Sequence, residues 1–220
     1  MKIQVSKILF VSSFPPTRCG IATFTTDLMQ ALSQKFSQSF TPEFCELASE
    51  ENLISNPAFR FNTKNKKEYV QIAQKINQAM EISLVHIQHE FGLFSGEYGE
   101  NLFDFLDILN KPVVFTFHTV LPEPNARLRE VVNKLASYAS GIFVMTCKSV
   151  EILEQEYDIN PALLHHVPHG THLVKWVEKR KIKARFDLEK RTVLSTFGLL
   201  GPGKSIETAL KALPQIIEFE

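Results

Sequence analysis

The sequence predicts an α/β protein built on a doubly wound, Rossmann-like parallel sheet. Short apolar runs typical of buried strands alternate along the chain with segments whose apolar residues recur at helical spacing. Glycine-containing turns, at 15–23 and 198–204, follow two of these runs, and each opens a helical segment. Regular alternation of strands and helices is the pattern of a parallel sheet wrapped by helices.

Each element has its own local signal. The first run, KILFV at 7–11, is almost entirely apolar, as expected for a strand covered on both faces. The helix that follows it carries Phe24, Leu28 and Leu32 on one face. The run at 113–117 comes directly after Pro112, a residue that often punctuates the start of a strand. The remaining strands are expected at 44–47, 59–62, 84–88, 142–146 and 164–167, and the helices at 22–36, 67–80, 98–109, 127–138 and 148–157.

A domain boundary is expected in the segment 173–191, which is basic and polar. A solvated connection explains such a composition more simply than a phosphate-binding patch. We therefore expect a first domain at 1–188, and in 189–220 the first strand-turn-helix unit of a second domain, with its strand at 192–197 and its helix at 205–219. One such unit cannot bury both faces of its strand, so the rest of that domain is expected beyond residue 220.

Charge and cysteine content narrow the class of protein. The chain has 24 basic and 24 acidic residues, so no overall field attracts nucleic acid, and we expect no nucleic-acid partner. Cys19, Cys45 and Cys147 are few and odd in number, which favours free thiols in a reducing compartment. A cytoplasmic location is expected, because no signal peptide or membrane-spanning run is evident. Peripheral membrane contact stays open, although the apolar residues of 98–109 are expected in the core.

Five segments in register with the predicted strand ends carry a family resemblance. Together they resemble the retaining, nucleotide-sugar-dependent glycosyltransferases of the GT-B fold, in the glycogen-synthase-like and phosphatidylinositol-mannosyltransferase-like group. The resemblance implies an N-terminal half of a GT-B fold, which mostly binds the acceptor, followed by the start of a nucleotide-binding domain. The segments are FPPTRCGIATF at 14–24, QHEFG at 88–92, FHT at 117–119, VPHG at 167–170 and GLLGPGK at 198–204.

The turn at 15–23 is the first candidate donor site. A glycine between a strand and a helix lets a diphosphate approach backbone amides at the positive end of the helix, and the alternative is a tight-turn glycine. The resemblance implies that the Gly20 and Ile21 amides face the donor diphosphate. Arg18 lies nearby and is able to add a charge-assisted hydrogen bond.

Two strand ends carry the candidate catalytic residues. His118 follows the strand at 113–117, at the edge of the sheet where doubly wound folds bind ligands, and the resemblance implies contact with the donor sugar. A structural histidine is the alternative. His89 and Glu90 end another strand and suggest an acid/base pair. The resemblance implies that a donor phosphate oxygen deprotonates the acceptor, which leaves Glu90 a supporting or acceptor-binding role.

Histidines also cluster at 165–172, but neighbouring strand positions point to opposite faces, and we expect no metal. His169 and Gly170 instead resemble the family segment that lines the interdomain cleft, whereas His172 stands where many relatives have an acid. Lys204 is a candidate diphosphate ligand, although its turn lacks the first glycine of a P-loop. Leu199 stands where the family usually has arginine.

The sequence thus predicts transfer of a hexosyl group, with retention and without a cofactor or metal, from a nucleotide sugar to a carbohydrate or lipid-linked acceptor. The 220-residue chain is expected to be inactive alone, because the missing C-terminal domain is its partner in catalysis. A noncatalytic binding or scaffold module is the alternative. A nicotinamide-dependent oxidoreductase is disfavoured, because the first turn lacks a full G-x-G-x-x-G.

Overall fold

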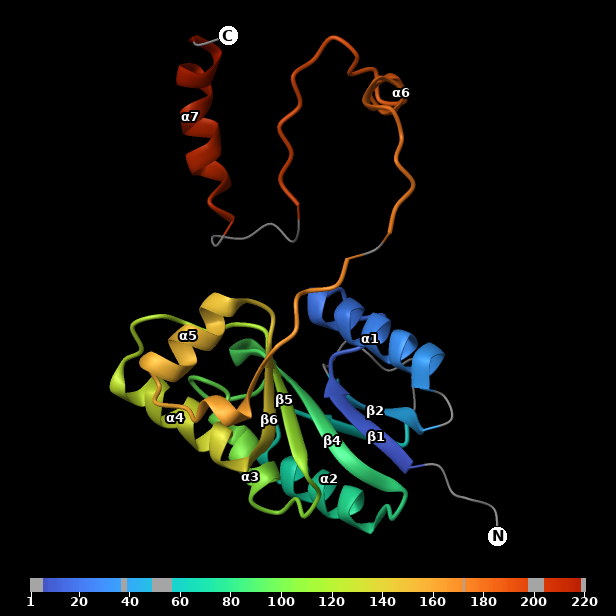
Figure 1. The fold of residues 1–220 in the computed structure, drawn as a ribbon, viewed down its shortest axis with the longest axis vertical. Coiled ribbons are helices and arrows are strands. Elements are labelled where there is room, and N and C mark those ends of the chain that lie inside the picture. Colours follow the sequence, from blue (N-terminus) through green and yellow to red (C-terminus); the bar gives the residue numbers. More distant parts are fainter. Residues whose placement is uncertain (1–5, 37–38, 49–56, 172, 198–203, 219–220) are drawn as a thin grey trace. The chain divides into compact units, whose positions relative to one another are not determined.

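The computed structural model describes residues 6–36, 39–48, 57–171, 173–197 and 204–218. Its chain contacts divide it into two compact units, Met1–Gly170 and Thr171–Glu220. Figure 1 traces both units along the chain. The domain boundary expected near residue 188 stays a prediction.

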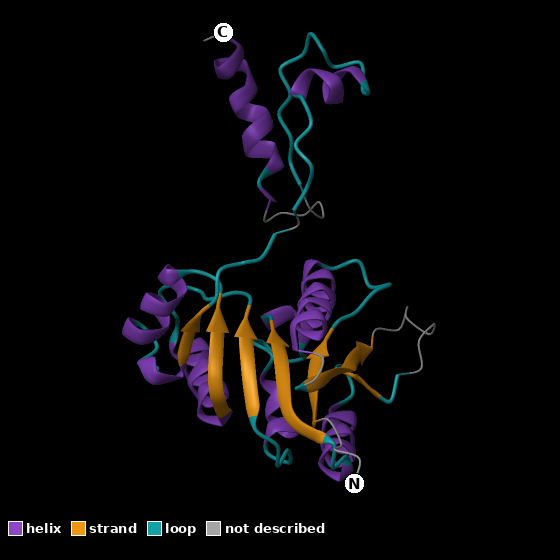
Figure 2. Ribbon diagram, turned by 45° about the vertical axis from the view of Figure 1, so that its right-hand side comes forward, coloured by secondary structure: helices purple, strands orange, loops and turns teal. Residues whose placement is uncertain are grey.

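The first unit contains a seven-stranded sheet in which every described pairing is parallel. The strand order is β3-β2-β1-β4-β5-β6-β7, which confirms the doubly wound prediction. Figure 2 shows these strands side by side with helices around them. The strands are β1 (Ser6–Ser12), β2 (Phe40–Ala48), β3 (Phe59–Asn62), β4 (Ile82–His89), β5 (Val113–Phe117), β6 (Ala139–Val144) and β7 (Leu164–His166).

Helices connect the strands, and most lie where apolar spacing predicts them. They are α1 (Gly20–Phe36), α2 (Lys66–Gln78), α3 (Phe103–Leu106), α4 (Ala126–Tyr138) and α5 (Cys147–Gln155), with short 3-10 turns η1 (Phe91–Leu93), η2 (Glu100–Leu102) and η3 (Pro161–Leu163). The helix expected at 98–109 is shorter than predicted. Gly96 and Gly99 have positive φ angles of 110° and 79°, so the chain enters this region in turns and only then becomes helical.

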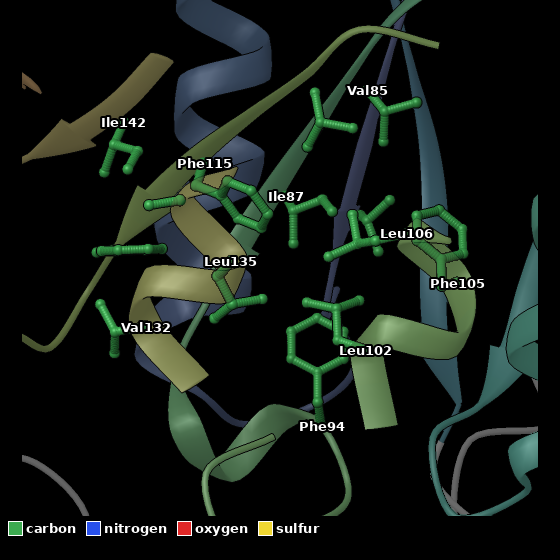
Figure 3. Packing of buried hydrophobic residues seen from close by; sticks show 14 of the residues in the cluster. Val85, Ile87, Phe94, Leu102, Phe105, Leu106, Phe115, Val132, Leu135 and Ile142 are labelled. Atoms are coloured by element: carbon green, nitrogen blue, oxygen red, sulfur yellow. The ribbon is translucent and has the colours of Figure 1, made fainter. Parts of the chain in front are cut away.

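The main core lies between one face of the sheet and helices α2, α3 and α4 (Figure 3). Ile87 and Phe115 from the sheet pack in the same cluster as Leu102, Phe105 and Leu135. Phe105 and Leu106 are buried, and Phe103 and Leu109 are partly buried against the cluster. Phe103, Phe105, Leu106 and Leu109 therefore belong to the core or pack against it, as expected from the sequence.

The opposite face of the sheet is covered by α1. Side chains alternate between faces along a strand, so Phe10 and His86 point away from the core formed by α2 to α4. They line an apolar groove of about 350 Å³ together with Phe24, Leu28 and Leu32 of α1. One face of β4 and β5 is therefore packed in the main core, and the other lines the groove under α1. The environment of a histidine at the sheet edge depends on which of these faces it is on.

The second unit contains α6 (Lys179–Ala184) and α7 (Ile206–Glu218). The helix expected at 205–219 is present, whereas α6 was not expected. The described residues 192–197 do not form the predicted strand, because no described strand of this unit pairs with them. Among its described residues none is buried, and apolar side chains such as Trp176 and Phe197 are exposed. No helix in the described part of the chain is long and apolar enough to cross a membrane.

Candidate functional site

The candidate site lies at the carboxyl ends of β1, β4 and β5. The strand order reverses direction between β1 and β4, and open α/β sheets bind ligands in the crevice outside such a switch point. The β1–α1 turn leaves the sheet at this edge, as do Glu90 after β4 and His118 after β5. The topology therefore brings the segments 88–92 and 117–119 to the same edge as the turn at 15–23.

Hydrogen bonds hold the β1–α1 turn in place. Thr25 donates to the carbonyl of Ile21 at 2.8 Å, and the buried Ser12 hydroxyl lies 2.8 Å from Thr25 Oγ1. Ser13 Oγ lies 3.4 Å from Cys19 Sγ. The first turn of α1 contains no acidic residue to neutralise the positive end of the helix. The turn is thus suited to an anion.

Gly20 occupies the first position of α1, and nothing in its local structure requires glycine. It is not among the described glycines with positive φ, and a Cβ there would meet no atom within 4 Å. The tight-turn explanation is therefore unsupported, and the space around Gly20 is open to a ligand. Ile21 is partly buried, and Arg18 is exposed, so its charge contributes little unless a ligand desolvates it.

His118 lies at the edge with three sets of neighbours. Its backbone N–H donates to the carbonyl of His89 at 3.0 Å, and its Nε2 lies 2.9 Å from Gln88 Oε1. The Phe24 ring meets it edge-on, with centroids 5.0 Å apart, and Phe24 also contacts the His169 ring at 5.3 Å. Burial, and secondarily the nearby His169, lowers the pKa of His118 to about 4. The ring is therefore neutral near pH 7.

His89 and Glu90 do not form the acid/base pair that their adjacency suggests. His89 is 1% exposed and packs against the rings of Phe91, Phe94 and Phe117 on the core face. Burial lowers the pKa of His89 to about 3, with a smaller effect of His118. Successive residues of a strand point to opposite faces, so His89 is sealed in the core while the chain beyond it turns outward.

Glu90 connects two loops at the sheet edge. Its Oε1 accepts a hydrogen bond from the backbone N–H of Phe91 at 3.1 Å, and its Oε2 accepts one from Thr119 Oγ1 at 2.5 Å. These contacts join the loop after β4 to the loop after β5, next to His118. The carboxylate is thus suited to support the loops.

The two histidines of β7 have different neighbours. His165 packs against Phe143, whereas His166 Nδ1 lies 3.4 Å from Cys147 Sγ. Among the residues that the structure describes, no group of three His, Cys, Asp or Glu side chains is placed to hold a metal ion. His172 lies outside the described residues.

His169 and Gly170 follow β7 and are exposed, and His169 reaches the site through Phe24. Gly170 resembles Gly20, because a Cβ there would meet no atom within 4 Å. Lys204 belongs to the second unit and is exposed, and the rest of its predicted turn, Gly198–Gly203, lies outside the described residues. The structure therefore brings His118, Glu90, His169 and the β1–α1 turn to one edge and leaves Lys204 untested.

Three residues at this edge were missed by sequence reasoning. In the sequence, Phe24 is an apolar helix position and the last residue of the segment 14–24, and Gln88 and Thr119 belong to other segments, but none of the three is a predicted site residue. Alternation along β4 was a usable signal, since it places Gln88 on the same face as His86 and opposite to His89. Nothing in the sequence indicated that Glu90 would bond Thr119.

Comparison with known protein families identifies the family of the segment that contains this sheet edge. Residues 19–175 match the profile described as Glycosyltransferase Family 4. The chain belongs to this family. The match begins next to Gly20 and includes His118 and His169. The resemblance to glycosyltransferases is thus confirmed, while the finer subgroup is not decided by this match.

Other comparisons are less informative. No curated protein matches the chain. Fourteen solved chains match, among them an "alpha-glucosyltransferase in complex with UDP and a 13-mer DNA containing a central A:G mismatch". The identity to that structure is 17% and the TM-score 0.41. The match covers 63% of this chain and 36% of that one, so the chain corresponds to about a third of that structure's length.

Proposed function

We propose that this chain forms the acceptor-side half of a retaining GT-B glycosyltransferase. The enzyme transfers a hexosyl group from a nucleotide sugar to a carbohydrate or lipid-linked acceptor. The observation that carries the proposal is the arrangement at the sheet edge, where a neutral, partly exposed His118 contacts Phe24 of α1, the helix that begins at the open position Gly20. Membership of glycosyltransferase family 4 supports the reaction class.

Each residue of the edge has a proposed role. The amides of Gly20 and Ile21 face the donor diphosphate, and Arg18 adds a charge once the ligand excludes water. His118 contacts a hydroxyl of the donor sugar. His169 and Gly170 contribute to donor binding, and Lys204 is a further candidate cation for the diphosphate.

The proposed mechanism does not use a protein base. Both carboxylate oxygens of Glu90 accept hydrogen bonds, so this group supports the loops that carry His118. Burial lowers the pKa of His118 to about 4, so its neutral ring is a weak base for an acceptor hydroxyl near pH 7. In the proposed step the bond between the anomeric carbon and the donor phosphate oxygen breaks, the acceptor oxygen bonds to that carbon on the same face, and the acceptor proton passes to a phosphate oxygen of the departing nucleoside diphosphate. We propose that no bound metal is required.

The test uses the complete gene product. It is incubated with UDP-glucose, UDP-N-acetylglucosamine or GDP-mannose and an oligosaccharide or polyprenyl-phosphate acceptor, and products are followed by mass spectrometry. The expected result is transfer from one donor with the anomeric configuration retained, unchanged by EDTA. Binding of donor without transfer to any acceptor would favour the alternative of a noncatalytic module. Product of inverted configuration would contradict the proposed mechanism.

A further inference from the structure

Gln88 is a buried side chain that touches the candidate site. It is fully buried on β4 and faces the side of the sheet covered by α1. Its Oε1 lies 2.9 Å from His118 Nε2. With the amide in this orientation, Gln88 presents its oxygen, which only accepts hydrogen bonds, so His118 Nε2 carries the proton and donates. The contact therefore determines which nitrogen of His118 is protonated.

The other nitrogen of His118 is left as an acceptor. With Nε2 protonated in a neutral ring, Nδ1 carries a lone pair. Nδ1 has no hydrogen-bond partner among the described residues, and the ring is only partly buried. A hydroxyl group that reaches this edge can therefore donate to Nδ1.

Packing alone does not explain why a glutamine occupies position 88, as its amide nitrogen shows. This nitrogen is buried and has no hydrogen-bond partner in the described part of the chain. A buried NH₂ group without a partner is destabilising, and an apolar side chain of similar size avoids that penalty. What glutamine provides at this position is its oxygen, and that oxygen contacts His118.

We propose that Gln88 is a positioning residue, which holds the His118 ring with Nε2 protonated so that Nδ1 accepts a hydrogen bond from a sugar hydroxyl. The part of this inference that concerns the sugar rests on the proposed function. The part that concerns the ring does not, because it follows from the contact between the two side chains.

Several titratable groups surround His118 and belong to its environment. His169 lies across Phe24, and His86 and His89 lie on β4 at positions where His118 lowers the pKa of each. Glu90 is held by Thr119, the residue after His118. Any change in the titration of His118 is therefore compared between variants that keep all of these groups.

The same face of the sheet offers a matched control. His86 Nε2 lies 2.8 Å from Thr116 Oγ1, so His86 and Thr116 also form a buried hydrogen bond between β4 and β5. Thr116→Val removes that bond and leaves Gln88 and His118 intact. Gln88→Leu removes the contact with His118. Both variants thus lose one buried hydrogen bond between the same two strands.

The first experiment records ring ¹⁵N chemical shifts of histidine-labelled 220-residue chain against pH. His118 in the wild type is expected to carry its proton on Nε2. Gln88→Leu is expected to populate the Nδ1–H form, and Gln88→Glu to raise the pKa of His118 by about one to three pH units, because an adjacent carboxylate favours the imidazolium. Thr116→Val is expected to leave the His118 ring unchanged. A wild-type ring protonated on Nδ1, or a ring unaffected by Gln88→Leu, overturns the inference.

The second experiment measures hexosyl transfer by the complete gene product. Gln88→Leu is expected to lower kcat/KM about tenfold, as for loss of one hydrogen bond in the transition state, and Gln88→Glu to move the acidic limb of the pH profile upward. Loss of transfer in His118→Ala with an unchanged rate in Gln88→Leu overturns the positioning role and leaves the proposed function standing. Transfer unaffected by both changes overturns the proposed role of His118.

Discussion

The ends of β4 and β5 each carry a histidine, yet their surroundings are opposite. His89 is enclosed by aromatic rings on the core face, and its Nε2 has no partner among the described residues. His118 lies one strand away, is partly exposed, and has Nε2 bonded to Gln88. Residue type and position at a strand end are therefore insufficient to identify a catalytic histidine. The face of the sheet and the partner of each nitrogen decide its role.

The largest expected effect on stability is at His89, the histidine enclosed by aromatic rings. His89→Ala is expected to lower the free energy of unfolding by about 3 kcal/mol, because it leaves a cavity among buried rings. Chemical denaturation of the 220-residue chain measures this change. His165→Ala, an exposed ring on β7, is the control and is expected to change stability by no more than about 0.5 kcal/mol. Equal effects in the two variants would contradict the distinction between buried and exposed histidines.

Acid is expected to act on stability through the buried rings. The pKa values of His89 and His86 are lowered by burial to about 3 and about 4, so the unfolded chain binds protons below pH 6.5 that the folded chain does not. Stability is therefore full above that pH and falls as the pH decreases toward 4. Each ring is expected to remove about 2 kcal/mol between pH 7 and pH 5.

The variant His89→Phe tests this assignment, because phenylalanine keeps an aromatic ring and removes the titrating group. Unfolding is measured by denaturant at pH 7 and pH 5 for both proteins. The loss of stability between these pH values is expected to be smaller in the variant by about 2 kcal/mol. An identical loss in variant and wild type would show that His89 does not titrate as described.

A change at Gly20 is expected to affect stability and donor binding in opposite directions. Gly20→Ala is expected to leave the fold intact and to raise stability by up to about 1 kcal/mol, because alanine favours a helix and its Cβ meets no atom. In the complete gene product the same change is expected to weaken donor binding roughly tenfold, because the Cβ occupies space proposed for the diphosphate. Unaltered donor affinity, measured by calorimetry, would place the diphosphate elsewhere.

The smallest effect is expected at the link between the two loops. Thr119→Val removes the hydrogen bond to Glu90 and keeps the shape of the side chain, so stability is expected to fall by about 1 kcal/mol. Thr26→Val is a matched control in α1, where the lost bond joins Thr26 to the carbonyl of Ala22. A large loss of transfer in Thr119→Val at unchanged stability would give the Glu90–Thr119 pair a direct role in catalysis.

The sequence allowed most of the fold to be predicted, because apolar runs and helical spacing are local. Strand 113–117 was located to the residue, and the sheet edge that carries His118 followed from it. The helix expected at 98–109 is longer than the observed α3, because apolar spacing does not reveal the positive φ angles of Gly96 and Gly99. The strand at 192–197 was not found, because strand formation depends on a partner.

The candidate site was predictable only in part. His118, Glu90 and the turn at Gly20 share an edge because parallel strands end together, which topology alone implies. The enclosure of His89 depends on Phe94, which comes from a loop five residues further along the chain. The contact of His118 with Gln88 depends on how two side chains meet across neighbouring strands. Such contacts arise from packing, which local sequence patterns do not report.

The most direct test compares hexosyl transfer by His118→Ala and His165→Ala in the complete gene product. Both residues are histidines near the same edge of the sheet, but only His118 is bonded to Gln88 beside the open turn. We predict that kcat/KM falls about 100-fold in His118→Ala, as for loss of a hydrogen bond to a buried polar group, and stays near the wild-type value in His165→Ala. Equal rates in the two variants would contradict the placement of the donor sugar at His118.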